Sequence, residues 1–277
     1  MMNTRQRGVA VVLAMGVVAL AAIAAAAMLA SQSTWARHAE LSAEHVQAQA
    51  LVQAGVDWAR ALLYDDRRLS GVDHLGEPWA MRLPPVPVDN GELAGRIEDQ
   101  QGAFNLNNVF NRGKPSPPQV LQLRRLLETL GLPDTLADAY LAAGRPLTDA
   151  AELALIPGFD AAARARLRPF VTALPRPTAL NVNTASPEVL AAVIEGLNLD
   201  AARELVAQRG RAYFRNRSEF LAQLPSGAVA GGNDVATGSE FFQASMRVTI
   251  GAAQARGSAL LERSNTGWPA VVWRKYP

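Results

Sequence analysis

The feature that most constrains this chain is an uncharged stretch of 22 residues near its start, Val9 to Ala30. As an α-helix this stretch is roughly 33 Å long, because each residue adds 1.5 Å. The apolar core of a bilayer is about 30 Å thick, so the stretch can cross it once. Arg5 and Arg7 precede it, and basic residues stay preferentially on the cytoplasmic side. The pattern predicts one membrane-spanning helix with a cytoplasmic N-terminus.

The residues that follow continue the helical pattern. Between Ser31 and Leu63 the first glycine or proline is Gly55, and apolar residues recur at intervals built from three and four. This spacing predicts one apolar helix face, with Leu41, Ala48, Leu51, Val52, Gly55, Trp58 and Leu62. The membrane segment (9–30) and the amphipathic segment (31–64) are expected to form one continuous rod of about 55 residues whose apolar face packs against a partner.

Three interpretations of this N-terminal region are open. The first is a plain membrane anchor. The second is a secretory signal peptide, since AAAAMLA offers small residues for cleavage, although the run exceeds the usual apolar core of about 7–15 residues. The third is that the whole rod is a structural element of the mature protein.

The charge balance limits the partners that the chain attracts. The formal net charge is +2, from 27 basic and 25 acidic residues, and Arg5 and Arg7 account for the excess. From residue 9 onward the charges balance, so the composition does not favour nucleic acid or an anionic surface as the main partner. The chain has no cysteine, which excludes structural disulfides and thiolate metal sites.

Strand patterns flank a helical block. Alternating residues predict a strand over 92–99, and further strands over 242–250, 254–263 and 270–276. Between the rod and the first of these strands, three prolines exclude a helix and a central strand, because proline lacks a backbone N–H: Pro84, Pro85 and Pro87.

From about Ser116 to Phe220 the periodicity is helical. Helices are predicted after capping residues and before glycines, over 117–130, 135–143, 149–156 (capped by Thr148), 161–167, from 186 onward, and over 200–209. A helical domain (113–225) is therefore expected to be inserted into one sheet, whose parts come from 65–112 and 226–277. The predicted fold class is α+β: a long N-terminal helix packed on a small antiparallel sheet, with a large inserted all-α domain.

A basic leader that ends in glycine, followed by such a rod, resembles the N-terminus of type IV pilins and pseudopilins. In that family a prepilin peptidase cuts after the glycine and methylates the new N-terminus. The resemblance implies a leader of residues 1–8, cleavage between Gly8 and Val9, and N-methylation of Val9. The family usually places glutamate at the fifth mature position, and this chain has Leu13 there.

The order of rod, sheet and inserted helical domain is similar to that of one group of minor pseudopilins, the K subunits of type II secretion systems (general secretion pathway protein K). The similarity covers nearly the whole chain through RGVAVVL, RIEDQQGAFNLNNV, RRLLETLGL and ALNVNTASPEVLAAV. Members of this group also lack the glutamate at position five, so Leu13 fits the resemblance.

This resemblance implies a structural protein without enzymatic activity or cofactor, which helps initiate the pseudopilus at its tip for protein export across the outer membrane. It implies a single-pass protein of the bacterial inner membrane with its globular part in the periplasm. The implied partners are the minor pseudopilins I and J and the prepilin peptidase. The family often carries an acidic, calcium-associated segment in the α-domain. Here Tyr140 runs directly into LAAGRPLTDAAEL, so calcium dependence is expected to be weak or absent.

The sequence contains no motif typical of a catalytic centre. The three histidines lack the spacing of metal ligands: His38, His45 and His74. Asp65, Asp66 and Asp73 offer oxygens for a hard cation, but calcium needs about six to eight oxygens in a tight loop. A solvated turn is the favoured interpretation of these aspartates, and no metal site is predicted.

A DNA-binding function is the alternative. Residues 180–220 and the phrase IPGFDAAARARL resemble helix-hairpin-helix modules of membrane-anchored competence receptors. Arginines and aromatics in the first segment offer contacts to phosphates and bases: Arg203, Arg209, Arg211, Tyr213, Phe214, Arg215 and Arg217. Such hairpins bind phosphate with free N–H groups at a helix N-terminus. Asp160 and Asp200 place negative charge there, so nucleic acid is not an expected partner.

Overall fold

The structure is a computed structural model that describes residues 4–111, 113–264 and 267–276. The side chains of residues 4–10 and of residue 33 lie outside this description. Gly8 and Val9, the predicted cleavage and methylation sites, are therefore placed by their backbone alone, which is helical.

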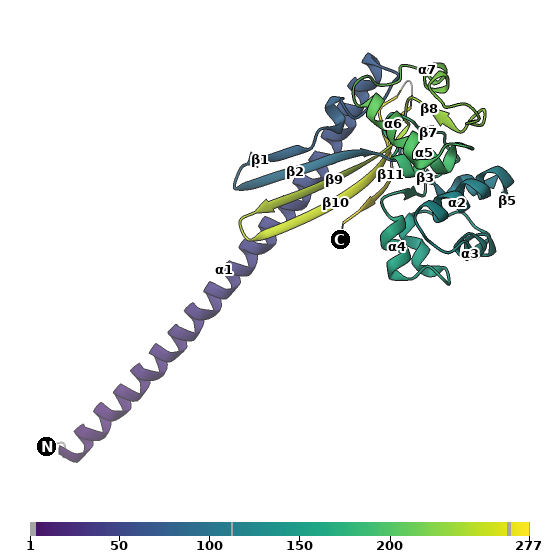
Figure 1. Ribbon diagram of the computed structural model, residues 1–277. Coiled ribbons are helices and arrows are strands. Elements are labelled where there is room, and N and C mark those ends of the chain that lie inside the picture. Colours follow the sequence, from purple (N-terminus) through teal and green to yellow (C-terminus); the bar gives the residue numbers. More distant parts are fainter. Residues whose placement is uncertain (1–3, 112, 265–266, 277) are drawn as a thin grey trace.

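The predicted rod is one unbroken helix, α1 (Thr4–Leu69, 66 residues), which projects from the globular part of the protein (Figure 1). It continues past residue 64, where the rod was predicted to end. Arg67 and Arg68 lie in its last turn, where positive charge is favourable against the negative end of the helix dipole. Its first half is long and apolar enough to cross a membrane, and no described part of the protein buries that stretch.

The second half of α1 packs on the sheet through a narrow face. Five side chains on this face are at most 1% exposed: Ala48, Val52, Val56, Ala59 and Leu63. At Gly55 the helix comes so close that an added Cβ atom would lie 3.0 Å from Met246 Sδ. Leu41 and Trp58 were predicted on the packed face, but they are 44% and 46% exposed. The prediction was wrong there because Leu41 precedes Ala48, the first buried side chain described in α1, and Trp58 lies off the face that Val56, Ala59 and Leu63 form.

The sheet has five antiparallel strands in the order β1-β2-β9-β10-β11. Their bounds are Leu83–Val88, Gly91–Asp99, Phe241–Ile250, Ala253–Glu262 and Ala270–Lys275. The last four were predicted to within one residue at each end. The prolines lie in β1 at the sheet edge, where a missing N–H interrupts no ladder. Strand β2 pairs directly with β9, with Asp99 opposite Phe242, so everything between them is inserted into one sheet.

The inserted segment folds as a separate layer of short helices beside the sheet (Figure 1). Its α-helices are α2 (Pro117–Thr129), α3 (Thr135–Ala143), α4 (Ala161–Leu167), α5 (Pro187–Val193), α6 (Leu199–Arg209) and α7 (Arg217–Ala222). Two predicted starts need correction. The segment η3 (Ala150–Leu155) is a 3₁₀ helix capped by Asp149, not an α-helix capped by Thr148. Asn198 caps α6 by accepting from the N–H of Ala201, so the helix begins before Asp200.

Short paired strands close the helical layer, and none of them was predicted. Strand β3 (Phe104–Asn105) pairs with β6 (Val171–Thr172), β7 (Leu180–Asn181) with β8 (Val235–Ala236), and β4 (Phe110–Asn111) with β5 (Lys114–Pro115). Two further 3₁₀ turns are η1 (Pro78–Ala80) and η2 (Leu106–Val109). The hydrophobic core of this part runs from Phe104 to Val235 and is separate from the core between α1 and the sheet.

Candidate functional site

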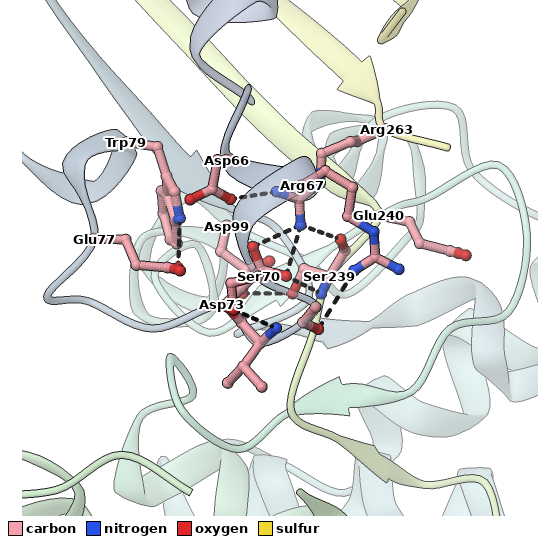
Figure 2. Close-up of polar contacts among 12 residues, drawn as sticks. Asp66, Arg67, Ser70, Asp73, Glu77, Trp79, Asp99, Ser239, Glu240 and Arg263 are labelled. Carbon is pink, nitrogen blue, oxygen red and sulfur yellow. Dashed lines mark hydrogen bonds and ion pairs between the residues drawn. The ribbon is translucent and has the colours of Figure 1, made fainter. Parts of the chain in front are cut away.

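A buried polar cluster lies where α1, the sheet and the helical layer meet, and we call it the polar junction (Figure 2). It comprises Asp66 at the end of α1, Asp73 and Glu77 in the following loop, Asp99 at the end of β2, Asn181 in β7, Ser239 before β9, and Arg263 after β10. These residues come from six separate segments of the chain. The junction therefore connects all three parts of the protein.

Arg263 is the centre of the junction and is only 2% exposed. Its Nη1 donates to Asp66 Oδ2 at 2.7 Å, and its Nη2 contacts both carboxylate oxygens of Asp73 at 2.5 and 2.6 Å. The same Nη2 donates to the carbonyl of Ser239 at 2.9 Å. The guanidinium also lies over the ring of Phe242, 4.5 Å from its centroid. One cation thus ties the end of α1 to the loop behind it and to the start of β9.

Asp99 connects the sheet to the helical layer. Its Oδ2 accepts from Thr184 Oγ1 at 2.5 Å, Ser239 Oγ at 2.7 Å and Asn181 Nδ2 at 2.9 Å. Asn181 is fully buried and also donates to the carbonyl of Asp73 at 3.1 Å. Burial raises the pKa of Asp99, although its hydrogen bonds oppose that shift. The network spans the boundary between the two hydrophobic cores.

Glu77 is a second carboxyl group of the junction with a raised pKa. Its Oε2 accepts from the backbone N–H of His74 and from Trp79 Nε1, both at 2.8 Å. Burial, with a smaller contribution from the charges of Asp66 and Asp73, raises the pKa of Glu77 to about 7. Burial also raises the pKa of Asp66, against the opposing effect of Arg263.

The junction corrects the interpretation of the aspartates as a solvated turn. Asp66 and Asp73 are 9% and 1% exposed, while Asp65 is exposed and takes no part. One oxygen from each of Asp66, Asp73 and Glu77 lies within 4.8 Å of the others, close enough for a shared cation. The guanidinium of Arg263 already fills the place between Asp66 and Asp73, so the donor set fits an arginine better than a metal ion. Arg263 lies 190 positions beyond Asp73, and no local pattern could have connected them.

The comparisons with known proteins agree on one family. Family models described as Type II secretion system (T2SS), protein K match residues 135–176 and 180–238. The type II secretion system protein K of Pseudomonas aeruginosa is 36% identical, over 99% of this chain and 93% of that protein. The chain belongs to the type II secretion system protein K family.

Two further comparisons extend this assignment. Protein K of Klebsiella pneumoniae is 31% identical over 99% of this chain and 98% of its own length. The crystal structure of the GspK-GspI-GspJ complex from the type 2 secretion system of enterotoxigenic Escherichia coli contains a chain that superimposes on this protein with a TM-score of 0.74. The two chains are 22% identical, and the match covers 87% of this chain and 99% of that chain. That likeness shows the fold, a long helix on a sheet with an inserted helical part.

The predicted N-terminal sites lie on the first half of α1. Leu13 is 65% exposed, and its apolar neighbours Val12 and Val17 are exposed to a similar extent. The surface that Leu13 presents is hydrocarbon, and the residues from 9 to 30 include no carboxylate.

The helix starts of the helical layer do not offer the free N–H groups that the DNA-binding alternative uses. Asp160 accepts from the N–H of Ala163 and Asn198 from that of Ala201, so both helix starts use their own caps. Two of the five predicted arginines bind the protein itself: Arg209 Nη1 donates to the carbonyl of Val182 and Arg217 Nη2 to that of Gly231. The other three are exposed: Arg203, Arg211 and Arg215. The comparisons favour the secretion family, so the competence interpretation is not favoured.

Proposed function

We propose that this protein K chain is a minor pseudopilin that occupies the tip of the type II secretion pseudopilus and helps initiate its assembly. In this proposal it is anchored in the bacterial inner membrane by the first half of α1, with its globular part in the periplasm. Its partners are the minor pseudopilins I and J. The similar chain from Escherichia coli was solved in a GspK-GspI-GspJ complex, which supports this choice of partners.

The observation that carries the proposal is Leu13. After cleavage behind Gly8, Val9 carries a positively charged amine within an apolar bundle of helices, and an unpaired buried charge costs several kcal/mol. In pilins, which this N-terminus resembles, the glutamate at position five of a subunit neutralises the amine of the subunit above it. Leu13 lacks a carboxylate, so this chain is not suited to lie beneath another subunit. The topmost subunit has no such requirement.

The shape of the protein supports the same position. The inserted helical layer adds a separate hydrophobic core beside the sheet, so the globular part is much wider than α1 (Figure 1). A repeating shaft would have to accommodate this width at every step, whereas a tip accommodates it once.

Crosslinking from position 13 tests the proposal. The chain has no cysteine, so Leu13→Cys introduces a single thiol, and Ala25→Cys on the same helix is the matched control. The tip position predicts crosslinks from position 13 to one subunit below and none to a subunit above, with tagged protein seen only at pseudopilus ends. Regular labelling of the wild-type protein along the shaft would contradict it.

Processing is tested separately at Gly8. Gly8→Val is expected to retain the leader, because the bulky side chain prevents an extended backbone from lying against the peptidase. Gly16→Val is the control, since an added Cβ atom at Gly16 meets nothing within 4 Å. Mass spectrometry of the purified protein should show a methylated N-terminus at Val9 in the wild type and in Gly16→Val. Normal maturation of Gly8→Val would show that the pilin interpretation of the leader is wrong.

A further inference from the structure

The face of the sheet that points away from α1 carries two arginines side by side, which we call the arginine pair. In the register of β9 and β10, Arg247 lies directly opposite Arg256, and both are exposed. The residues before them, Met246 and Ala255, belong to the core under α1, and successive side chains of a strand point to opposite faces. Like charges directly opposite each other destabilise a sheet, so the fold itself does not account for this pair.

The arginine pair has no counter-charge within the chain. Neither side chain has a hydrogen bond or an ion pair with any residue that the structure describes. The residue of β2 in the same row, Ala94, is apolar. Arg96, one row further along β2, is by contrast paired with Glu98 at 2.8 Å. The pair is therefore a local surplus of positive charge on a chain whose charges balance from residue 9 onward. An arginine guanidinium binds a carboxylate through two parallel hydrogen bonds.

The arginine pair borders a groove of about 1070 Å³ between the sheet and the helical layer. The next row of the sheet, with Arg96, Ser258 and Lys275, forms one wall, and α4 forms the other. Each carboxylate in the lining is engaged within the chain: Glu98 with Arg96, Asp149 with Lys275, and Asp99 with the donors of the polar junction. Arg168, at the end of α4, adds a positive charge that no described residue neutralises. The turn ends of the hairpins extend beyond the helical layer (Figure 1), so the pair and the groove form one open surface.

The position of this surface excludes a lipid headgroup as its ligand. Gly257, next to Arg256, packs so closely on α1 that an added Cβ atom would lie 2.5 Å from Val52. From Ala30, the end of the apolar stretch, to Val52 the helix rises about 33 Å. The interfacial region of a bilayer is only about 5–8 Å thick on each side, so the arginine pair lies well beyond it. This step rests on the proposed membrane anchor, and the arginine pair itself does not.

A long polyanion fits the surface poorly, because acidic residues lie on both sides of the arginine pair. On β2, Glu92 lies one row from the pair toward the turns, and Glu98 lies two rows away toward the groove. DNA carries one negative charge about every 1.7 Å, so a duplex that lies across this face meets both carboxylates. A short acidic segment of a protein carries its charges over a few residues and avoids them.

We propose that the arginine pair and its groove bind a short acidic segment of a partner protein. One carboxylate of the segment binds Arg247 and a second binds Arg256. Directly opposite Cβ atoms in a sheet are about 5 Å apart, which matches acidic residues at positions i and i+4 of a helix, about 5–6 Å apart. The groove receives the rest of the segment, where Arg168 favours a further acidic residue. The inference does not depend on the position of the protein in the pseudopilus.

Fluorescence anisotropy of the full chain in phosphatidylcholine nanodiscs tests this binding. The probe is acetyl-Ala-Glu-Glu-Ala-Ala-Glu-Glu-Ala-amide with an uncharged dye, and the matched probe has glutamine in place of each glutamate. We expect saturable binding of the acidic probe that weakens with added salt, and at least tenfold weaker binding of the neutral probe. Absence of saturable binding up to millimolar concentrations would overturn the proposal. So would stronger displacement of the probe by duplex DNA or by phosphatidylglycerol vesicles than by unlabelled acidic peptide, which would assign the surface to another ligand.

Paired variants assign the contacts. Arg247→Gln and Arg256→Gln are each expected to weaken binding of the acidic probe about tenfold. Arg247→Lys keeps the charge but loses the forked geometry of the guanidinium, so it should weaken binding less than Arg247→Gln. Arg211→Gln, at an exposed arginine of the helical layer, is the matched control and should bind as the wild type does. Equal weakening by Arg211→Gln would overturn the assigned contact.

Two further readouts separate binding from folding and from assembly. Each glutamine variant removes one of two opposed like charges, so the midpoint of its urea unfolding should not fall below that of the wild type. A lower midpoint together with weaker binding would show that the arginines support the fold and would overturn their assignment to a partner. Crosslinking from position 13 involves no residue of this surface, so the tip proposal and the acidic-segment proposal can fail independently.

Discussion

The polar junction and a second polar region, the pocket of the helical layer whose walls include Gln119, Arg217 and Asp234, use similar residues differently. In the junction, the guanidinium of Arg263 makes four hydrogen bonds through its Nη atoms, and Asp99 accepts from four donors. In the pocket, Gln119 and Arg217 are each held by one hydrogen bond, to Asp234 and to the carbonyl of Gly231. Buried unpaired atoms occur in both regions, at Arg263 Nε as well as at Arg217 Nε and Gln119 Oε1. The two regions therefore differ in the number of hydrogen bonds made within the chain, and the junction is expected to contribute more to the stability of the fold.

The largest loss of stability is expected when Arg263 of the junction is replaced. Arg263→Met keeps most of the side-chain volume but leaves Asp66 and Asp73 buried without their cation. Breaking one partner of a buried ion pair typically costs about 3–5 kcal/mol, so the free energy of unfolding should fall by that amount in urea titrations. Arg256→Met, on an exposed position of β10, is the control. A loss below about 1 kcal/mol would show that the junction is not a main source of stability.

Removing the amide that bridges the two cores should have the next largest effect. Asn181→Leu deletes the donor shared by the Asp73 carbonyl, Asp99 and Ser239, and the acceptors remain buried. The expected loss is about 1–3 kcal/mol. Amide hydrogen exchange should become faster both at Thr184 and its neighbours and in β9. Faster exchange on only one side of the junction would argue that the junction does not connect the two cores.

A smaller effect is expected at Glu77, and it depends on pH. The folded protein holds a proton on Glu77 up to about pH 7, whereas the unfolded chain releases it near the ordinary carboxyl pKa. The contribution to the free energy of unfolding is therefore present at low pH and is lost as the pH rises through 7. Glu77→Gln stays neutral and keeps an oxygen for the same donors. Its unfolding free energy should exceed that of the wild type at pH 8 by on the order of 1 kcal/mol and match it near pH 4. An identical pH profile for both proteins would contradict the shifted pKa.

Substitution in the pocket of the helical layer should affect stability least. Gln119→Met loses one partly exposed hydrogen bond to Asp234 but also removes an unpaired buried oxygen, so the two effects oppose each other. We expect the free energy of unfolding to change by less than about 1 kcal/mol, measured beside Asn181→Leu under the same conditions. A loss as large as that of Asn181→Leu would mean that the pocket supports the fold in the same way as the junction.

Calcium is expected to change neither region. The acidic segment that the family resemblance implies has no counterpart in the residues that follow Tyr140, LAAGRPLTDAAEL, and Arg263 already lies between the two aspartates of the junction. The melting temperature of the full chain should therefore be the same with millimolar calcium as with a chelator. A ligand-induced rise of the kind that follows from binding to the folded state would show that other oxygens hold the ion.

The parts predicted well from the sequence are those with local signals. The helix α1, strands β2, β9, β10 and β11, and most helix starts follow from periodicity and capping over short windows. The helical insertion was also predictable, because strand patterns occur on both sides of it. Family membership and the missing glutamate at Leu13 followed from short motifs.

The features that the sequence did not predict involve contacts between residues that lie far apart along the chain. Asp73 and Arg263 meet only after the sheet has formed around the insertion, so two aspartates that are buried were expected to be solvated. Trp58 was placed on the packed face because it is apolar, whereas the close approach at Gly55 selects small side chains there. The unpaired atoms of Gln119 and Arg217 depend on a loop bound to Asp234 and have no sequence pattern of their own.

The continuity of α1 has a mechanical consequence. A helix of 66 residues is about 100 Å long, and it has no proline or break at which it could bend. A push or a twist applied at the membrane end is therefore expected to reach its last turn, where Asp66 is bound to Arg263. The polar junction transmits such a load to the sheet and to the helical layer at the same time. The globular part is therefore expected to move as one body with α1.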